Sequence, residues 1–258
     1  MTFKFVCLNL WHGGILFDDV VHFLKEQDAD IVALQEVFSS DDKKLPSHFR
    51  SIESLRKHID YPYYDFAPAV VDKWSYGNVL NGNAVLSRFP ITERDVTFFN
   101  HALDKNNPRN PFDSKLFPVT PRNLQHIALE TPAGEINVFN LQGVWDLDGD
   151  NVSPQRQKMS HTILKAIENK SNVIVAGDTN AKYTNPVMKA IEDKLTNVFG
   201  DSLTTSFNMR RKDNPGYATA VVDMIYASHD FEIVDRECPD VDITDHLPLV
   251  ATFTIKDK

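Results

Sequence analysis

The 258-residue chain has little cysteine, no long apolar run and no excess of basic residues. Its two cysteines, Cys7 and Cys238, stand near opposite ends and match neither a metal-binding spacing nor a disulfide framework. No stretch of about 18 apolar residues occurs, so we expect no transmembrane helix. Residues 3–8 already have the pattern of a strand, so we expect no signal peptide. We therefore expect a cytoplasmic monomer that forms no stable association with membranes.

The charge balance limits the kind of ligand that the protein can bind over a wide area. The chain has 36 acidic residues against 27 Lys and Arg, which gives a formal net charge of −9. A broad, sequence-independent grip on a nucleic-acid backbone needs a basic face, so such a grip is disfavoured. Nucleic acid itself is not excluded, because a local basic patch or bound cations can reverse the field at a site.

Apolar runs and turn signals predict a strand-rich α/β (α+β) fold. We expect strands at 3–8, 31–34, 63–71, 82–87, 124–129, 136–141, 172–176, 221–226, 231–234 and 249–255. We expect helices at 18–25, 47–59, 153–168 and 186–193. The proline-rich segment 101–121 is predicted as a long loop without structure of its own, either functional or mobile. No repeat or linker divides the chain, so residues 1–258 are expected to form one domain of two packed sheets flanked by helices.

Polar side chains follow two of the buried strands directly. Glu36 comes just after the strand at 31–34, and Asp178 and Asn180 follow the strand that ends at 176. A carboxylate at the end of a buried strand is desolvated unless a partner compensates it. A hard cation such as Mg²⁺ is one such partner, because it takes oxygen ligands. The alternatives are an ion pair between Glu36 and a Lys or Arg, and an Asx-turn at 177–180.

A second polar group lies near the end of the chain. His246 follows Asp245 and precedes the last strand, where it can move a proton or donate to a phosphoryl oxygen. Asp223 is an acid inside an apolar run, and a buried acid needs a partner. His246 would be that partner and would gain a fixed tautomer in return. The alternative is that His246 is an ordinary histidine of a surface loop.

As an ordered set, these segments resemble the endonuclease/exonuclease/phosphatase family, which includes deoxyribonuclease I and apurinic/apyrimidinic endonucleases. The matching segments are residues 8–9, 34–36, 82–88, 177–180, 222–225 and 244–246. Each is weak alone, but they occur in the family's order and span nearly the whole chain. The resemblance implies a deoxyribonuclease I-like, four-layer α-β-β-α sandwich. It also implies hydrolysis of phosphoesters that depends on Mg²⁺ or Mn²⁺.

The resemblance assigns roles to particular residues. The implied metal ligands are Asn9, Glu36 and Asp245. The implied catalytic residues are Asp178, Asn180, Asp223 and His246. Among them, Asp178 would orient or deprotonate the attacking water and Asn180 would help to place the phosphate. His246, braced by Asp223, would stabilise the charge that develops in the transition state.

The chain departs from the family pattern at Gln142. Many members place a histidine after the strand that corresponds to 136–141, and glutamine can bond a phosphate oxygen but cannot shuttle a proton at neutral pH. Apurinic/apyrimidinic endonucleases also lack that histidine, so activity is still expected. Membership in the sphingomyelinase or deoxyribonuclease I subgroup is less expected. His12 can be a further ligand or phosphate contact, or simply a loop histidine. The substrate-binding candidates are His12, Asn83, Arg122 and Gln142.

Two function classes remain open at the level of sequence. The first is a metal-dependent phosphodiesterase, a nuclease or an enzyme acting on nucleotide conjugates. The second, motivated by Gln142, is a catalytically weak member that serves as a binding module. A phosphatase acting on inositol phosphates or phospholipids is a further option, disfavoured by the lack of an evident membrane-binding helix. Basic and aromatic residues in 101–123 and 206–217 suggest contacts with phosphates and bases.

Overall fold

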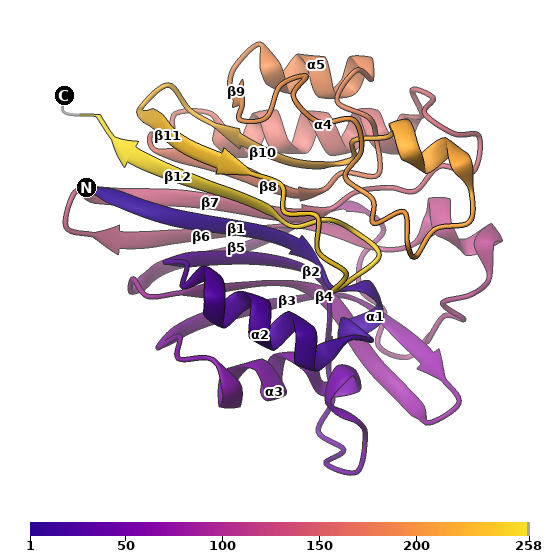
Figure 1. Ribbon diagram of the computed structural model, residues 1–258. Helices are drawn as coiled ribbons and strands as arrows, with labels where there is room; N and C mark the ends of the chain where they lie inside the picture. Colours follow the sequence, from indigo (N-terminus) through magenta and orange to yellow (C-terminus); the bar gives the residue numbers. More distant parts are fainter. Residues whose placement is uncertain (257–258) are drawn as a thin grey trace.

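In the computed structural model, which describes residues 1–256, the strands form two six-stranded sheets (Figure 1). The first sheet has the order β11 (Phe231–Glu237), β12 (Leu249–Ile255), β1 (Thr2–Asn9), β2 (Ile31–Ser39), β4 (Gly77–Ser87) and β3 (Tyr63–Trp74). The second has the order β5 (Ile91–Asn100), β6 (Arg122–Thr131), β7 (Gly134–Gln142), β8 (Val173–Asp178), β10 (Asp223–Ala227) and β9 (Thr196–Asn197).

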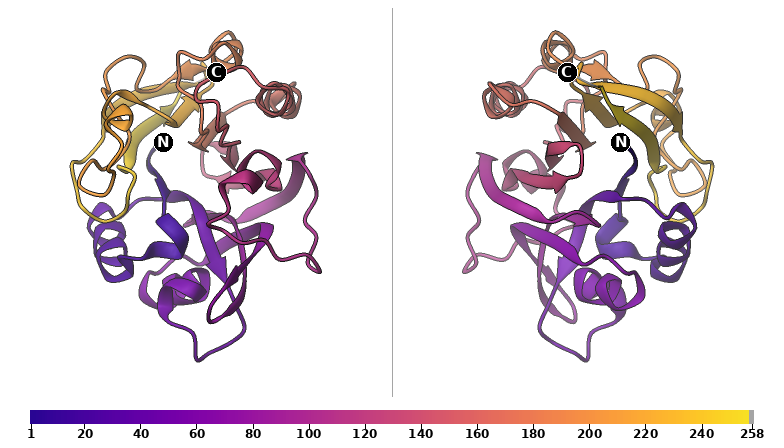
Figure 2. Two further views of the ribbon diagram at one scale, coloured as in Figure 1. Left: turned by 90° about the vertical axis from the view of Figure 1, so that its right-hand side faces the viewer. Right: turned by 90° about the vertical axis from the view of Figure 1, so that its left-hand side faces the viewer.

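Helices cover the outer face of each sheet. The α-helices are α1 (Trp11–Gly14), α2 (Phe17–Gln27), α3 (Ser51–His58), α4 (Pro154–Ile167) and α5 (Pro186–Glu192). Short 3₁₀ helices are η1 (Ser47–Arg50), η2 (Ser114–Val119) and η3 (Pro215–Thr219). The pair α2 and α3 packs on the first sheet and the pair α4 and α5 on the second, so the predicted four-layer sandwich is confirmed (Figure 2). In residues 1–256, no helix is long and apolar enough to cross a bilayer.

Each central strand contributes side chains to two apolar layers. In β1, Phe5 faces the layer between the sheets, whereas Val6 and Leu8 face α2 and α3. Ile127 and Val138 complete the inner layer from the second sheet. Successive side chains of a strand point to opposite faces, so a strand buried on both faces reads as a continuous apolar run. This explains why the central strands are visible in the sequence.

The structure contains elements that the sequence did not predict, among them α1, β5, β9 and η3. The edge strand β5 was not expected, because residues 92–97 are exposed and show no apolar alternation. The segment 101–121 was expected to lack structure, but it contains η2 and is tied to β3 by backbone hydrogen bonds between Arg109 and both Val71 and Lys73. The Arg109 side chain also pairs with the buried Asp72 at 2.5 Å. These long-range contacts anchor a segment that shows no periodicity of its own.

Candidate active site

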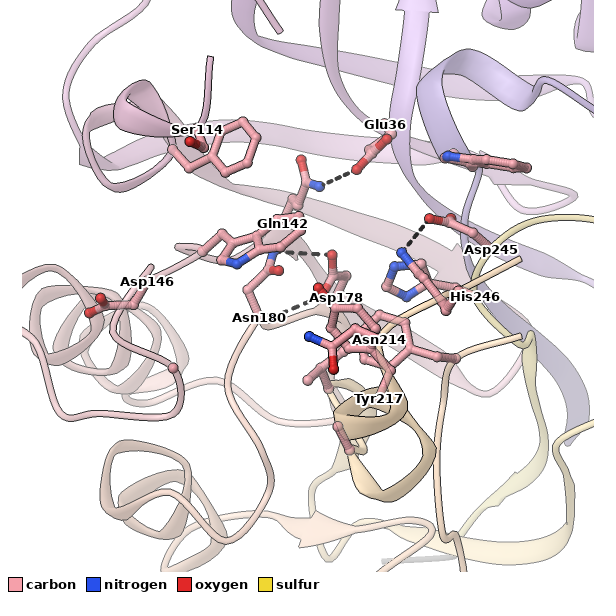
Figure 3. Close-up of a pocket in the computed structure, with 18 of the residues that line it drawn as sticks. Glu36, Ser114, Gln142, Asp146, Asp178, Asn180, Asn214, Tyr217, Asp245 and His246 are labelled. Atoms are coloured by element: carbon pink, nitrogen blue, oxygen red, sulfur yellow. Dashed lines mark hydrogen bonds and ion pairs between the residues drawn. The ribbon is translucent and has the colours of Figure 1, made fainter. Parts of the chain in front are cut away.

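The polar residues predicted from the sequence converge at one end of the two sheets. Strands β1 and β2 are parallel, and so are β7 and β8. Asn9, at the carboxyl end of β1, is in register with Gln35 and so lies next to Glu36, and Gln142 is in register with Asp178. Asp223 joins from the antiparallel β10, directly opposite Asp178. Both sheets therefore deliver their polar ends to one cavity (Figure 3).

Glu36 projects from a bulge in β2. The pairing with β4 shifts register between Leu34 and Val37, and Glu36 has a left-handed backbone with φ of 55°. A non-glycine residue in this conformation is strained by about 1–3 kcal/mol and is common at functional sites. The bulge turns the carboxylate out of the sheet. The sequence showed the acid at the strand end but not the bulge that aims it.

The Glu36 carboxylate accepts hydrogen bonds from three neutral N–H donors, and Nδ1 of the His12 ring lies 3.6 Å from its Oε2. Its Oε1 accepts hydrogen bonds from the amides of Gln142 at 2.8 Å and Asn9 at 3.3 Å, and its Oε2 accepts one from the backbone N–H of His12 at 2.8 Å. Burial alone would raise the pKa of Glu36, but the His12 ring and N–H, together with the charges of His246 and Arg122, lower the pKa to about 2. Among the described residues Glu36 has no Lys or Arg ion-pair partner, so the alternative of such a pair was wrong.

Asp178 ends β8 after a glycine that no other residue can replace without rearrangement. A Cβ at Gly177 would lie 1.9 Å from the carbonyl oxygen of Leu141, and the backbone φ is 150°. Asp178 Oδ1 accepts from the backbone N–H of Asn180 at 3.0 Å, which is the Asx-turn considered as an alternative. Its Oδ2 accepts from the side-chain amides of Asn9 and Asn180, each at 3.1 Å. The turn therefore orients the carboxylate and does not exclude a role in the site.

The environment of Asp178 favours the protonated form. Burial is the largest cause, and the neighbouring Asp223 carboxylate adds to it. The positive charge of His246 opposes both, and the pKa of Asp178 is raised to about 6. Near neutral pH this carboxylate is ionised, yet it binds a proton far more readily than an exposed aspartate.

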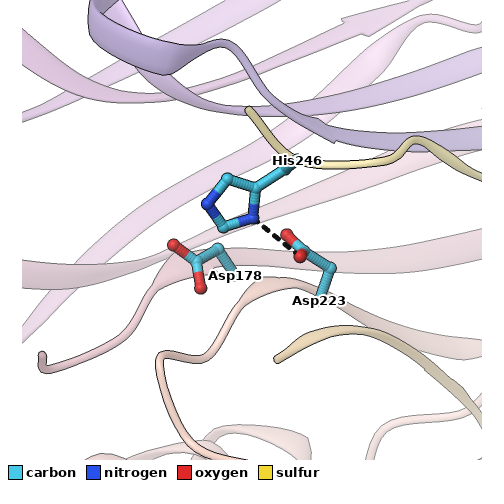
Figure 4. A group of neighbouring side chains, drawn as sticks. All are labelled: Asp178, Asp223 and His246. Carbon is cyan, nitrogen blue, oxygen red and sulfur yellow. Dashed lines mark hydrogen bonds and ion pairs between the residues drawn. The ribbon is translucent and has the colours of Figure 1, made fainter. Parts of the chain in front are cut away.

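His246 and Asp223 form the contact predicted from the sequence. Nδ1 of His246 lies 2.8 Å from Oδ2 of Asp223, and the histidine is only 5% exposed (Figure 4). Burial would lower the pKa of His246, but Asp223 and the adjacent Asp245 raise it to about 10. The other ring nitrogen, Nε2, points away from Asp223 on the side where Asp178 lies. His246 is therefore not a surface histidine.

Asp245 lines the cavity but is bound to a lysine that the sequence did not mark as a site residue. Its Oδ2 lies 2.5 Å from Nζ of Lys212. Its Oδ1 is buried and has no hydrogen-bond partner within residues 1–256. Lys212 had been noted only as part of a basic loop segment. Nothing in the local pattern pairs it with an acid 33 residues further along the chain.

Gln142 bridges an acid and a base at the position where many relatives carry a histidine. Its Nε2 donates to Glu36 (Figure 3). Its Oε1 accepts from Nη1 of Arg122. Arg122 is 7% exposed and its Nε has no partner among the described residues. Burial and the like charge of Arg109 lower the pKa of Arg122 to about 10, so it still carries a positive charge at neutral pH. The pair places that charge beside Glu36.

The cavity has a volume of about 530 Å³ and aromatic walls. Phe117 and Trp145 stack at 5.0 Å between ring centroids, and Phe207 and Tyr217 lie 4.5 Å apart. The predicted residues that line it are His12, Glu36, Arg122, Gln142, Asp178, Asn180, Asp245 and His246. Arg156 was missed: its guanidinium bonds the backbone carbonyls of the loop at 144–151 and of Asn180. Its place in a helix gave no signal of this role.

Three predicted residues stand behind the cavity wall. Asn9 directs its amide N–H₂ to Glu36 and Asp178, while its Oδ1 accepts from the Trp11 backbone. Its contacts are those of a positioning group, and metal ligation by Asn9 stays a prediction. Asp223 acts through His246. Asn83 bonds Asn123 between the sheets and is absent from the described cavity lining, so the structure lends no support to direct substrate contact by Asn83.

The residues present fit a divalent cation. One ligand-type atom each from Asp178, Asp223 and His246 lies within 4.8 Å of the others. A histidine that retains its proton is a poor ligand, however, and Asp223 is already bound to it. Glu36 is the better candidate, because it is ionised, lines the cavity and has neutral N–H partners. Hard cations bind such oxygen donors.

Comparison with known proteins supports the same fold. The chain is similar to an endonuclease/exonuclease/phosphatase from Beutenbergia cavernae, with 18% identity, a TM-score of 0.77 and coverage of 98% of this chain and 72% of that one. It is also similar to the human Nocturnin catalytic domain with bound sulfate, at 14% identity and a TM-score of 0.70, covering 99% and 95% of the two chains. A mannosyl-6-phosphatase from Bacteroides thetaiotaomicron matches at 17% identity and a TM-score of 0.66, covering 98% and 100%. Curated protein sequences give no match.

Structural similarity at 14–18% identity establishes the fold alone. The family is established by a match to a protein-family sequence model. The model described as "Endonuclease/Exonuclease/phosphatase family" matches residues 6–246, which is most of the chain. Its members hydrolyse phosphoesters with divalent metal ions, and the acidic cavity described above fits that chemistry. The chain belongs to the endonuclease/exonuclease/phosphatase family.

Proposed function

We propose that this protein hydrolyses phosphodiester bonds with a bound Mg²⁺ or Mn²⁺ ion, acting on a nucleic acid or a nucleotide conjugate. The observation that carries the proposal is the His246–Asp223 pair, which stands beside Asp178 in the cavity that Glu36 also lines. An acid-base pair, a second carboxylate and a metal-binding carboxylate are the groups that metal-assisted phosphoryl hydrolysis requires.

Glu36 would hold the metal ion. The ion, when bound, neutralises negative charge on the phosphoryl group and polarises its oxygen. Gln142 and Asn9 keep the Glu36 carboxylate in one orientation through their N–H donors. Those hydrogen bonds fix the orientation of a ligand, which typically changes metal affinity by about 10–100-fold when lost.

Asp178 is the residue best placed to take a proton from the attacking water. Its pKa of about 6 leaves it ionised at neutral pH while keeping its basicity close to the working pH. Hydrogen bonds from Asn9 and Asn180 fix its position. Oδ1 carries a single protein donor and retains a lone pair for the water.

His246 would act as a cation and a donor. Its Nδ1 is held by Asp223, so Nε2–H is available for a phosphoryl oxygen as negative charge builds up in the transition state. Arg122 supplies a second positive charge from the neighbouring wall. Gln142 has no titrating nitrogen, so in this chain His246 bears the role of acid.

The aromatic side chains that line the cavity favour a substrate that carries nucleobases. Trp145, which is 39% exposed and stacks on Phe117, offers a face on which a nucleobase can stack. The net charge of −9 favours a substrate held by this local site over one held along an extended backbone.

Hydrolysis assays test the proposal. With Mg²⁺ or Mn²⁺, wild-type protein should turn over bis-p-nitrophenyl phosphate, and Glu36→Ala should not. If wild type shows no turnover, or Glu36→Ala matches it, the protein is a binding module and the enzymatic proposal fails. A panel of nicked, abasic, single-stranded and 5′-tyrosyl DNA, RNA and phosphoinositides then identifies the substrate class.

A further inference from the structure

Lys212 is enclosed in the cavity wall and not exposed to solvent on a flexible loop. Its side chain is 15% exposed, and its Nζ lies 2.5 Å from Oδ2 of Asp245, whose side chain is 9% exposed. Nζ also stands 5.0 Å from the ring centre of Phe207 and 5.3 Å from that of Tyr217. The ammonium group is thus surrounded by one carboxylate and two aromatic faces, which is a built site for a cation.

The backbone holds this lysine in place. Asn208, four residues before it, donates its backbone N–H to the carbonyl of Asp245 at 3.0 Å and its side-chain amide to the carbonyl of Thr244 at 2.8 Å. The segment that carries Lys212 is therefore bonded directly to the segment that carries Asp245. The two segments are held together by these bonds, so only the side-chain rotamers of Lys212 and Asp245 remain to be ordered when the ion pair forms.

The carboxylates of the site differ in their partners. Glu36, Asp178 and Asp245 line the cavity near His246, as Asp146 and Asp150 do elsewhere in its wall, and Asp223 stands behind His246. Asp223 is paired with His246, and Asp245 with Lys212. Glu36 and Asp178 receive hydrogen bonds from neutral amides, and in the described part of the chain neither has a Lys or Arg partner, although Nδ1 of His12 lies 3.6 Å from Glu36. Asp245 thus differs from Glu36 and Asp178 in being paired with a lysine.

We propose that Lys212 is a built-in cation that neutralises Asp245, so that the cavity takes one divalent ion, at Glu36, and no second ion at Asp245. The ammonium neutralises the carboxylate at Oδ2, the rings of Phe207 and Tyr217 lie against it, and the remaining oxygen, Oδ1, is buried away from solvent. This inference rests on the proposed metal dependence. It changes one expectation from the sequence, since Asp245 becomes a partner of Lys212 in place of a metal ligand.

Binding of Mn²⁺ alone, followed by electron paramagnetic resonance and equilibrium dialysis, tests this assignment without any activity assay. Wild type should bind one Mn²⁺ per chain. Asp245→Asn should leave the affinity within about threefold, whereas Glu36→Gln should lower it by at least about tenfold, as expected for loss of a charged ligand. Lys212→Met keeps the apolar stem but removes the charge, and should add a second Mn²⁺ or tighten binding by about tenfold.

Further variants separate charge from folding. Lys212→Arg should bind Mn²⁺ like wild type, and Lys212→Met/Asp245→Asn, which leaves no unpaired charge, should bind a single ion. Lys182→Met, at another lysine lining the cavity, is the matched control and should change nothing. The inference is overturned if Asp245→Asn weakens binding as much as Glu36→Gln, or if Lys212→Met binds like wild type. If Glu36→Gln binds Mn²⁺ as wild type does, the proposed function itself fails.

Discussion

Nδ1 of His246 lies 2.8 Å from Oδ2 of Asp223, and both side chains are buried. Asp223 begins β10 and His246 precedes β12, so this contact joins the ends of the two sheets. It fixes the histidine ring and leaves Nε2 as the only ring nitrogen free to act in the cavity. The chemistry proposed for His246 depends on this one hydrogen bond.

The first prediction concerns the charge of His246. In the metal-free protein, the pKa of about 10 means that both ring nitrogens carry protons at pH 7.5. Nitrogen chemical shifts of the labelled ring will show the imidazolium signature. In Asp223→Asn the neutral form should predominate at the same pH, because the largest cause of the raised pKa is gone. A neutral ring in wild type at pH 7.5 would contradict the assignment.

The raised pKa of His246 also predicts how the free energy of unfolding depends on pH. The pKa of His246 is higher in the folded than in the unfolded protein, where it is about 6.5. The stabilisation from the charged pair is therefore complete below about pH 6.5 and is lost as pH rises towards 10. Urea unfolding of the metal-free protein across this window should show a steeper loss in wild type than in Asp223→Asn. If the free energy of unfolding falls with pH equally in the two proteins, the His246–Asp223 pair does not contribute to stability in this way.

The second set of variants measures catalysis. His246→Ala should lower kcat on bis-p-nitrophenyl phosphate by about 100-fold or more, since it removes a charge that stabilises the transition state. Asp223→Asn should lower kcat less, because Nε2 remains. His22→Ala, at an exposed histidine of α2, serves as the control and should behave as wild type. Full activity in His246→Ala would remove this residue from the mechanism.

Gln142 offers a third prediction. Gln142→Ala removes the donor to Glu36 and the acceptor of Arg122. We expect Mn²⁺ affinity to fall by about tenfold, as for other groups that orient a metal ligand. Equilibrium dialysis measures this directly. Unchanged affinity would mean that the bridge between Glu36 and Arg122 does not organise the metal site.

The sequence predicted which residues form the site, but it predicted few of the contacts between them. Glu36 and Asp178 were visible because each comes after an apolar run that is buried on both faces, and Asp223 because it interrupts an apolar run. These segments occur in the same order as in the family, and this resemblance predicted the four-layer fold. Burial on two faces produces a one-dimensional pattern, and so the central strands could be predicted.

Contacts between distant segments left no such pattern. The pairing of Lys212 with Asp245 and the anchoring of Arg109 on Asp72 each join loops to remote elements. Asn83 shared a family motif but faces the interior, because the strand β4 turns it towards Asn123 between the sheets. A strand residue's face depends on register and bulges, which the sequence alone does not reveal.

The fourth prediction concerns the glycine that precedes Asp178. Gly177→Ala should destabilise the protein by about 3 kcal/mol or more, because its Cβ would meet the Leu141 carbonyl at 1.9 Å. Gly134→Ala is the matched control: its φ is also positive, at 112°, but nothing lies within 4 Å of a Cβ there. We expect Gly134→Ala to lower the free energy of unfolding by about 1–2 kcal/mol, from the backbone strain alone. Equal losses in urea unfolding would show that steric contact at Gly177 is unimportant.

The most direct test of the account is the metal-dependent turnover of wild type and Asp178→Asn side by side. Each protein is stripped with EDTA and assayed on bis-p-nitrophenyl phosphate before and after addition of Mn²⁺. We predict that wild type is inactive when stripped and recovers with Mn²⁺. Asp178→Asn should bind the ion yet stay at least about 100-fold slower, since it lacks the base. Turnover by stripped wild type, or recovery of Asp178→Asn to the wild-type rate, would contradict metal-assisted hydrolysis at this site.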